Sequence, residues 1–285
     1  MKMYCVKGMF LASLILVFCF SACHSAPSTS SPVQGLKFQS QNWKETIELN
    51  LESAGGKPRM LITLTLLDLP EAPNSPDIEV RRNLRQAMRQ SIYDNKEPSA
   101  YAQSIISDYR VQYLQQNEFL KDFPEWPLDG LNWDFTEYVN VEASPEGSQS
   151  RVFSRNRIYY LGGDHGREEK IYFVAGEGIP DMLTLDYFIR GGAGSSILAE
   201  RLVRELRRLK GLADNVPLST GGFSTDNIEV PDNFFINSEG IGFRWNTAEI
   251  APYDEGFFEV VIPYSRLQDI MTPQGRDVIG PKAQL

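Results

Sequence analysis

Residues 230–264 carry the pattern that most restricts how this chain can fold. Apolar residues stand at alternate positions on both sides of a short polar turn that ends in Gly240, as expected for a β-hairpin. A third run, at residues 257–262, is apolar and β-branched and is followed by Pro263, which suits the end of a strand. Three such strands form a sheet with an apolar face. The rest of the chain must supply a partner that covers this face.

The other segments of the chain read as further strands and helices. Alternating apolar residues predict strands at residues 43–51, 60–69, 131–141, 152–161 and 172–175. Apolar residues three and four apart predict helices near residues 81–92, 98–113 and 195–209. We therefore predict an α+β protein with antiparallel sheets, helices packed on one face and two subdomains. The expected subdomains are an N-terminal strand-helix part, residues 41–125, and a C-terminal α+β part, residues 126–285.

The first residues have the features of an export signal. Lys2 and Lys7 give a short positive region before an apolar run at residues 9–20 that is too short to span a bilayer comfortably. Small residues then precede Cys23, as in the signal peptide of a bacterial lipoprotein. We expect residues 1–22 to be removed and Cys23 to be acylated, which would attach the protein to a membrane through a flexible tether of residues 23–40. An ordinary cleaved secretory signal is the alternative.

The cysteine content and the charge agree with export to the bacterial cell envelope, facing the periplasm or the cell surface. All three cysteines lie at or before position 23, so the folded part has no disulfide and no thiol chemistry. The formal net charge is −9, and removal of Lys2 and Lys7 with the signal would change it to −11. An acidic protein does not suit a nucleic-acid partner and attracts cationic partners instead.

Catalytic patterns are scarce in the sequence. The two histidines are His24 and His165, so a histidine-rich metal site is not expected, and neither a Gly-x-Ser-x-Gly elbow nor a phosphate-loop motif occurs. We predict no metal and no cofactor and assign no catalytic residue. An enzyme that acts on cell-wall glycan or peptide stays open as the competing class, with His165 and nearby carboxylates as its candidate groups.

A glycine-rich loop is the first candidate binding site. It consists of Gly162, Gly163, Asp164, His165 and Gly166. Its glycines would let a backbone approach a ligand closely, and its histidine is the only one in the folded part. The alternative is a tight turn in which the glycines supply positive φ angles and the histidine holds the loop by a hydrogen bond.

The connection at residues 246–256 is the second candidate binding site. It contains Glu249 and Tyr253 between two apolar strands. It forms either a recognition edge or a structural loop that packs Ile250 and Tyr253 while Glu249 accepts hydrogen bonds from backbone donors.

A stripe of arginines marks the helix near residues 81–92. Arg81, Arg85 and Arg89 are four residues apart and therefore share one face of the helix. We interpret this face as solvated, because long basic side chains are common on the outer face of an amphipathic helix. A binding surface is the alternative.

Both candidate loops lie in segments that resemble a known family. Residues 160–166, Tyr-Leu-Gly-Gly-Asp-His-Gly, resemble the Tyr-Thr-Gly-Gly-Ala-His-Gly segment of that family. Residues 233–264 resemble its ending, which contains Tyr-Glu-Ile-Ala-Pro-Tyr-x-x-Gly and Ile-Pro-Tyr. The family is the extracytoplasmic domain shared by the anti-sigma-V factor RsiV and the peptidoglycan deacetylase PdaC. The resemblance covers about residues 131–272.

The resemblance implies a binding module. In the anti-sigma factor this domain is a receptor for lysozyme, and in the deacetylase it accompanies a separate catalytic domain whose metal-binding motif is missing here. The resemblance therefore implies a cell-envelope module that binds a lysozyme-type protein or peptidoglycan, and the N-terminal signal adds the expected lipid anchor. Two positions differ from the usual family sequence, because Ala248 replaces a tyrosine and Asp164 replaces an alanine.

Overall fold

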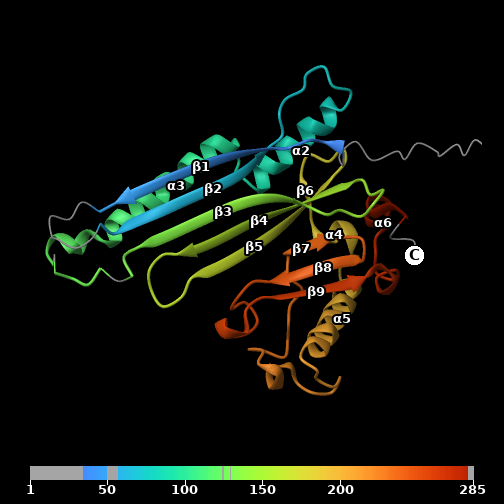
Figure 1. Ribbon diagram of the computed structural model, residues 1–285. Helices are drawn as coiled ribbons and strands as arrows, with labels where there is room; N and C mark the ends of the chain where they lie inside the picture. Colours follow the sequence, from blue (N-terminus) through green and yellow to red (C-terminus); the bar gives the residue numbers. More distant parts are fainter. Residues whose placement is uncertain (1–34, 50–56, 124, 129, 282–285) are drawn as a thin grey trace, which may run out of the picture.

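The computed structural model describes residues 35–49, 57–123, 125–128 and 130–281, which form two β-sheets and the helices that cover them (Figure 1). The α+β class predicted from the sequence is confirmed. The predicted signal peptide and the proposed acylation site Cys23 lie outside the described residues. Within the described residues, we find no helix with the length and apolar character needed to cross a membrane.

The larger sheet has the strand order β1-β2-β3-β4-β5-β6. Its strands are β1 (Gln39–Glu48), β2 (Arg59–Asp68), β3 (Trp133–Glu142), β4 (Ser150–Tyr160), β5 (Arg167–Gly176) and β6 (Met182–Leu183). Neighbouring strands are antiparallel, as predicted, with the exception of β2 and β3. These two are parallel because the chain crosses from one end of the sheet to the other through two helices. The expected subdomain boundary near residue 125 thus falls between two hydrogen-bonded strands.

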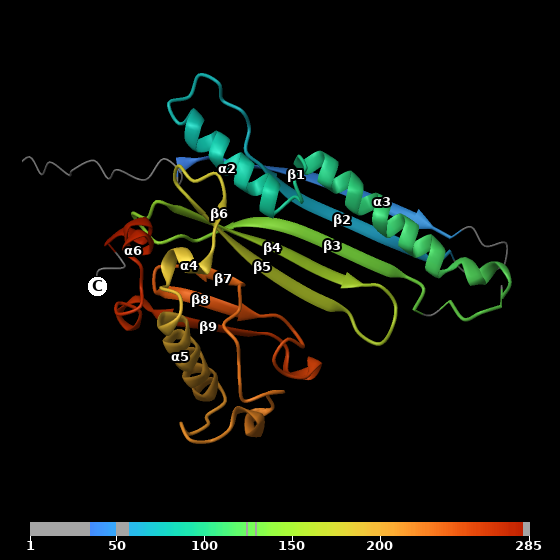
Figure 2. The same ribbon diagram turned by 180° about the vertical axis from the view of Figure 1, so that it is seen from behind.

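Two helices cover one face of the six-stranded sheet (Figures 1 and 2). They are α2 (Ile78–Ser91) and α3 (Pro98–Gln116). The buried residues Leu84 and Met88 of α2 are four apart, as the helical period requires. On α3, the rings of Tyr109 and Tyr113 pack on Phe135 and Trp133 of β3, with ring centroids 4.2 and 5.1 Å apart. These contacts form one of the two hydrophobic cores.

The small sheet is antiparallel and confirms the hairpin and the third strand predicted from residues 230–264. It consists of β7 (Phe234–Ile236), β8 (Gly240–Trp245) and β9 (Phe258–Pro263) in that order. Helix α5 (Ala193–Leu209) covers one face with Leu198, Leu202 and Leu206. The other face lies against β5, where the ring of Phe235 packs on Tyr172 at 4.4 Å. The two cores comprise residues between positions 36 and 279, so a chain that begins at residue 34 contains both.

Short elements complete the described chain. They are α4 (Leu185–Phe188), α6 (Pro273–Ile279), and the 3-10 helices η1 (Glu118–Lys121), η2 (Leu218–Gly221), η3 (Tyr253–Glu255) and η4 (Tyr264–Arg266). The sequence analysis missed α6, although Thr272 accepts a hydrogen bond from Gly275 N at 2.9 Å and Pro273 follows, a usual start of a helix.

Tyr93 joins the helical layer to the end of β2. Its buried hydroxyl donates a hydrogen bond to Leu67 O at 2.7 Å and accepts one from Leu67 N at 3.0 Å, and burial raises its pKa. Tyr93→Phe leaves both backbone groups without this partner, so we expect the free energy of unfolding to fall by about 2 kcal/mol. Denaturant unfolding measures the change. Tyr160→Phe, which removes a hydroxyl from an exposed hydrogen bond to Gly163 O, serves as control and should cost less than about 0.5 kcal/mol. Equal costs for the two variants would contradict this role of Tyr93.

Candidate functional site

The two candidate loops meet in the structure. The ring of His165 stacks on the ring of Tyr253, with centroids 5.0 Å apart and planes inclined by 15°. The Tyr253 hydroxyl donates a hydrogen bond to Gly166 O. Gly162 and Gly163 have φ angles of 81° and 92°, which a glycine adopts without strain and which turn the chain between β4 and β5. The glycine-rich loop and the connection between β8 and β9 therefore form one surface.

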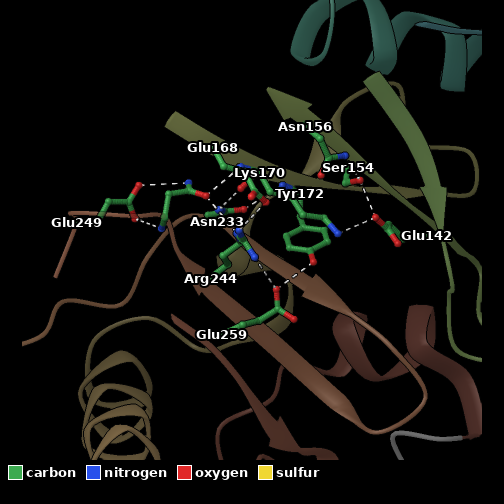
Figure 3. Close-up of polar contacts among 11 residues, drawn as sticks. Glu142, Ser154, Asn156, Glu168, Lys170, Tyr172, Asn233, Arg244, Glu249 and Glu259 are labelled. Carbon is green, nitrogen blue, oxygen red and sulfur yellow. Dashed lines mark hydrogen bonds and ion pairs between the residues drawn. The ribbon is translucent and has the colours of Figure 1, made fainter. Parts of the chain in front are cut away.

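Two asparagines link the small sheet to the edge of β5 (Figure 3). On the edge of β5 that faces away from β4, strand β6 pairs with only Val174 and Ala175. The earlier backbone groups on this edge therefore need other hydrogen-bond partners. Asn246 Oδ1 accepts a hydrogen bond from Lys170 N at 2.9 Å. Asn233 Oδ1 accepts one from Tyr172 N at 2.9 Å, and its Nδ2 donates one to Lys170 O at 2.8 Å. The two side chains thus replace a neighbouring strand.

Glu249 fixes the position of Asn246. Its Oε2 accepts a hydrogen bond from Asn246 N at 2.8 Å, and its Oε1 accepts one from Asn246 Nδ2 at 3.3 Å. The carboxylate thereby orients the amide that binds β5. Glu249 is itself solvent-exposed, at the border of the polar network in Figure 3.

Arg244 is the buried centre of this network. The residue is 3% exposed and lies opposite Glu259 in the pairing of β8 with β9. Its Nε donates a hydrogen bond to Asn246 Oδ1 at 3.1 Å, and its terminal nitrogens lie 3.4 Å from Glu259 and 3.7 Å from Glu168. The guanidinium carbon is 3.9 Å from the ring centroid of Phe257, a cation–π contact that supports this exposed ring from below.

Lys170 and Glu142 form an ion pair beside the network. Lys170 Nζ lies 2.9 Å from Glu142 Oε1, which also accepts a hydrogen bond from Ser154 Oγ at 2.6 Å. Partial burial tends to raise the pKa of Glu142, but the hydrogen bonds from Ser154 and Lys170 outweigh it, so the pKa lies below its ordinary value of 4.5.

The lowered pKa of Glu142 makes a pH dependence of stability expected. A carboxyl group whose pKa is lower in the folded state stabilises the fold above its unfolded pKa and loses that contribution as the pH falls through the folded pKa. Glu142→Gln should therefore cost stability at pH 7 and progressively less below about pH 4.5. Denaturant unfolding between pH 3 and pH 7 tests this. A cost that does not change with pH would contradict the charged role of Glu142.

The two loops and the residues that follow them carry a group of exposed side chains, which we call the loop surface. It consists of Asp164, His165, Glu168, Tyr253, Asp254 and Phe257. Tyr253 is 40% exposed and Phe257 is 50% exposed. The carboxylates of this surface are those of Asp164, Glu168 and Asp254, and the exposed cation Arg167 lies beside them in the sequence. The surface combines two held aromatic rings with negative charge.

The sequence analysis missed Arg244 and the two asparagines. Arg244 alternates with Phe243 and Trp245, so the pattern indicates a position that faces solvent. The structure covers this face with β5. One feature of the sequence indicated that this face is covered. Phe235, an apolar residue that pairs with Gly242 across the hairpin, lies on the same face as Arg244. Among the described residues, no group of three His, Cys, Asp or Glu side chains is placed to hold a metal ion.

In comparisons with known proteins, part of the chain is similar to one sequence family. Residues 187–265 match the model of a family described as a protein of unknown function, DUF3298. This range includes α5 and all three strands of the small sheet, with Arg244 and Tyr253, and excludes the glycine-rich loop. No curated protein matches the chain.

Two solved structures resemble the whole fold. A member of the DUF3298 family from Bacteroides fragilis NCTC 9343 has a TM-score of 0.72 and 21% sequence identity, over 88% of this chain and 98% of that chain. A DUF3298 family protein from Pseudomonas aeruginosa PAO1 has a TM-score of 0.54 and 14% identity, over 85% of this chain and 97% of that chain. These similarities show that the two-sheet fold occurs in other proteins.

Proposed function

We propose that the protein is a lipid-anchored binding module of the bacterial cell envelope and that its partner is a cationic protein of the lysozyme type. The observation that carries this proposal is the loop surface, where the exposed rings of Tyr253 and Phe257 stand among carboxylates. Aromatic side chains often provide most of the binding energy of a protein interface. Carboxylates near them favour a partner of positive charge and speed its approach.

The loop surface is held in place before a partner arrives. Tyr253 is fixed by the stacked ring of His165 and by its hydrogen bond to Gly166 O. Phe257 rests on the buried guanidinium of Arg244. Because these side chains are already ordered, binding costs less conformational entropy than it would on a flexible loop.

The resemblance to the RsiV and PdaC domain supports the same type of partner. Both loops lie in segments that match the motifs of that family, whose anti-sigma member is a receptor for lysozyme. Ala248 stands where the family usually has a tyrosine, so Tyr253 and Phe257 would supply the aromatic contacts in this protein. The N-terminal sequence supports the lipid anchor, with acylation at Cys23.

Calorimetric titration tests the proposed function. The soluble chain from residue 34 is titrated with a lysozyme, and separately with peptidoglycan fragments, at low and at physiological salt. We expect saturable binding of lysozyme that persists at physiological salt. Saturable binding of the fragments alone would assign the glycan as the partner, and hydrolysis of the fragments would identify an enzyme. Lysozyme binding that disappears as salt rises would reduce the effect to general charge attraction and overturn the proposal.

A further inference from the structure

The arginines of α2 line a cavity, in which Arg81 and Arg85 are mostly buried and Arg82 and Arg89 stay exposed. The cavity has a volume of about 610 Å³ and lies between α2 and the segment that precedes it. That volume is within the range of small-molecule binding sites. Arg81, Arg82, Arg85 and Arg89 all contribute to its wall, and Pro73 and Ile78 add apolar surface. Helix α2, whose arginines line the cavity, lies on the opposite side of the six-stranded sheet from the small sheet (Figures 1 and 2).

Each arginine of the cavity already has at least one carboxylate partner, and these ion pairs differ in how easily a ligand can replace the carboxylate. Arg81 and Asp77 are mostly buried, with nitrogen and oxygen 3.1 Å apart, so this pair is part of the fold. Arg85 is also mostly buried, at 24% side-chain exposure, and it has two carboxylate partners. Glu71 lies 2.7 Å from Arg85 and is 81% exposed, and Glu97 lies 3.5 Å away and is 44% exposed. An exposed carboxylate contributes little to stability, because water and salt compete for it.

Glu71 therefore lies where a carboxylate or phosphate group of a ligand would bind. A guanidinium offers several N–H donors in one plane, which suits oxyanions, and Arg85 presents this group in the cavity wall. Arg89 is one helical turn further on and pairs with Glu97 at 3.1 Å, and both of these side chains are about half exposed. Arg85 and Arg89 are thus two neighbouring cationic groups whose present partners can exchange with solvent.

We propose that this cavity binds a small anion with at least two oxyanion groups, and that the ligand displaces Glu71 from Arg85. The second oxyanion group is bound by Arg89, and the apolar part of the ligand contacts Pro73 and Ile78. A cavity of about 610 Å³ has room for an anion larger than a single phosphate or sulfate ion. The ligand is a polycarboxylate or a polyphosphate, because both chemistries satisfy the same donors. The inference is independent of the proposed function, since it concerns other residues on another side of the molecule.

Titration with two probe anions tests the site. The soluble chain from residue 34 is titrated with citrate and, separately, with inorganic pyrophosphate at about 0.15 M ionic strength. We expect saturable binding of at least one anion with a stoichiometry of one. The better ligand distinguishes a carboxylate source from a phosphate source. Absence of saturable binding by both anions would overturn the proposal.

Variants of the two sides of the ion pair give opposite expected results. Arg85→Ala should raise the Kd for the bound anion at least tenfold, whereas Glu71→Gln should lower it about threefold, because it removes the competing carboxylate. The matched controls are Arg204→Ala and Glu229→Gln, which change the charge equally at exposed positions outside the cavity. Thermal unfolding checks that Arg85→Ala is folded. Arg85→Lys keeps the charge but not the planar guanidinium, so it should weaken anion binding less than Arg85→Ala does. If each variant has the same Kd as its control, the anion does not bind at Arg85.

Discussion

Gly240→Ala is expected to lower the free energy of unfolding by about 3 kcal/mol. A Cβ atom at this position would lie 2.0 Å from the carbonyl oxygen of Ile262 and 2.9 Å from the Cα of Pro263. Both are backbone atoms of β9, which cannot rotate away as a flexible side chain can. The substitution therefore has to push β9 from β8, and the apolar contacts of the small sheet with α5 are lost with it.

A glycine in open space provides the control for Gly240. Gly191 has no heavy atom within 4 Å of an added Cβ and does not have a positive φ angle. Gly191→Ala should change the free energy of unfolding by less than about 0.5 kcal/mol. Urea unfolding of both variants, followed by tryptophan fluorescence, measures the difference. A Gly240→Ala variant as stable as the wild type would show that the two strands do not approach as closely as described.

Arg244→Met is expected to cost about 3 kcal/mol of stability, at the lower end of the range for breaking a buried ion pair. Methionine keeps part of the apolar volume but removes every donor. Glu259 and Asn246 lose their charged partner in a region where Arg244 itself is only 3% exposed. Phe257 loses the guanidinium beneath its ring. The loss should therefore also reduce lysozyme binding, since the ring is no longer held at the surface.

Arg244→Lys separates charge from shape. Lysine keeps the positive charge near Glu259 but lacks the planar group that stacks on Phe257 and binds Asn246 at the same time. We expect Arg244→Lys to be more stable than Arg244→Met and less stable than the wild type by denaturant unfolding. If lysine and arginine give equal stability, the position needs only a charge, and the described role of the guanidinium plane is wrong.

Local patterns predicted the elements of the fold well, but not how the two halves join. The hairpin around Gly240 and the helix with Leu198 and Leu202 follow from the spacing of apolar residues along the chain, which indicates whether a segment is a strand or a helix. The parallel pairing of β2 with β3 depends on where two helices return the chain to the sheet. Spacing within a strand carries no information about that return.

In the candidate site, too, the local segments were predictable from the sequence and the contacts between them were not. Residues 162–166 stood out from the sequence because their glycines let a ligand approach the backbone and His165 is the single histidine expected in the folded part. Tyr253 stood out because its loop joins two apolar strands. Their contact, through the stacked rings of His165 and Tyr253, spans most of the C-terminal half of the chain and was not predictable from local pattern. Arg244 was missed because alternation in one strand assumes a solvated second face, and here β5 covers that face.

Binding of a lysozyme to the double variant Tyr253→Ala/Phe257→Ala, at physiological salt, tests the central claim most directly. The matched control is Val111→Ala/Leu114→Ala, which removes two exposed apolar side chains from α3 on the opposite side of the six-stranded sheet. If the loop surface binds the partner, the first variant raises the Kd at least tenfold while the control retains the wild-type value. Equal affinity of the two variants, or no binding by the wild type, would contradict the account.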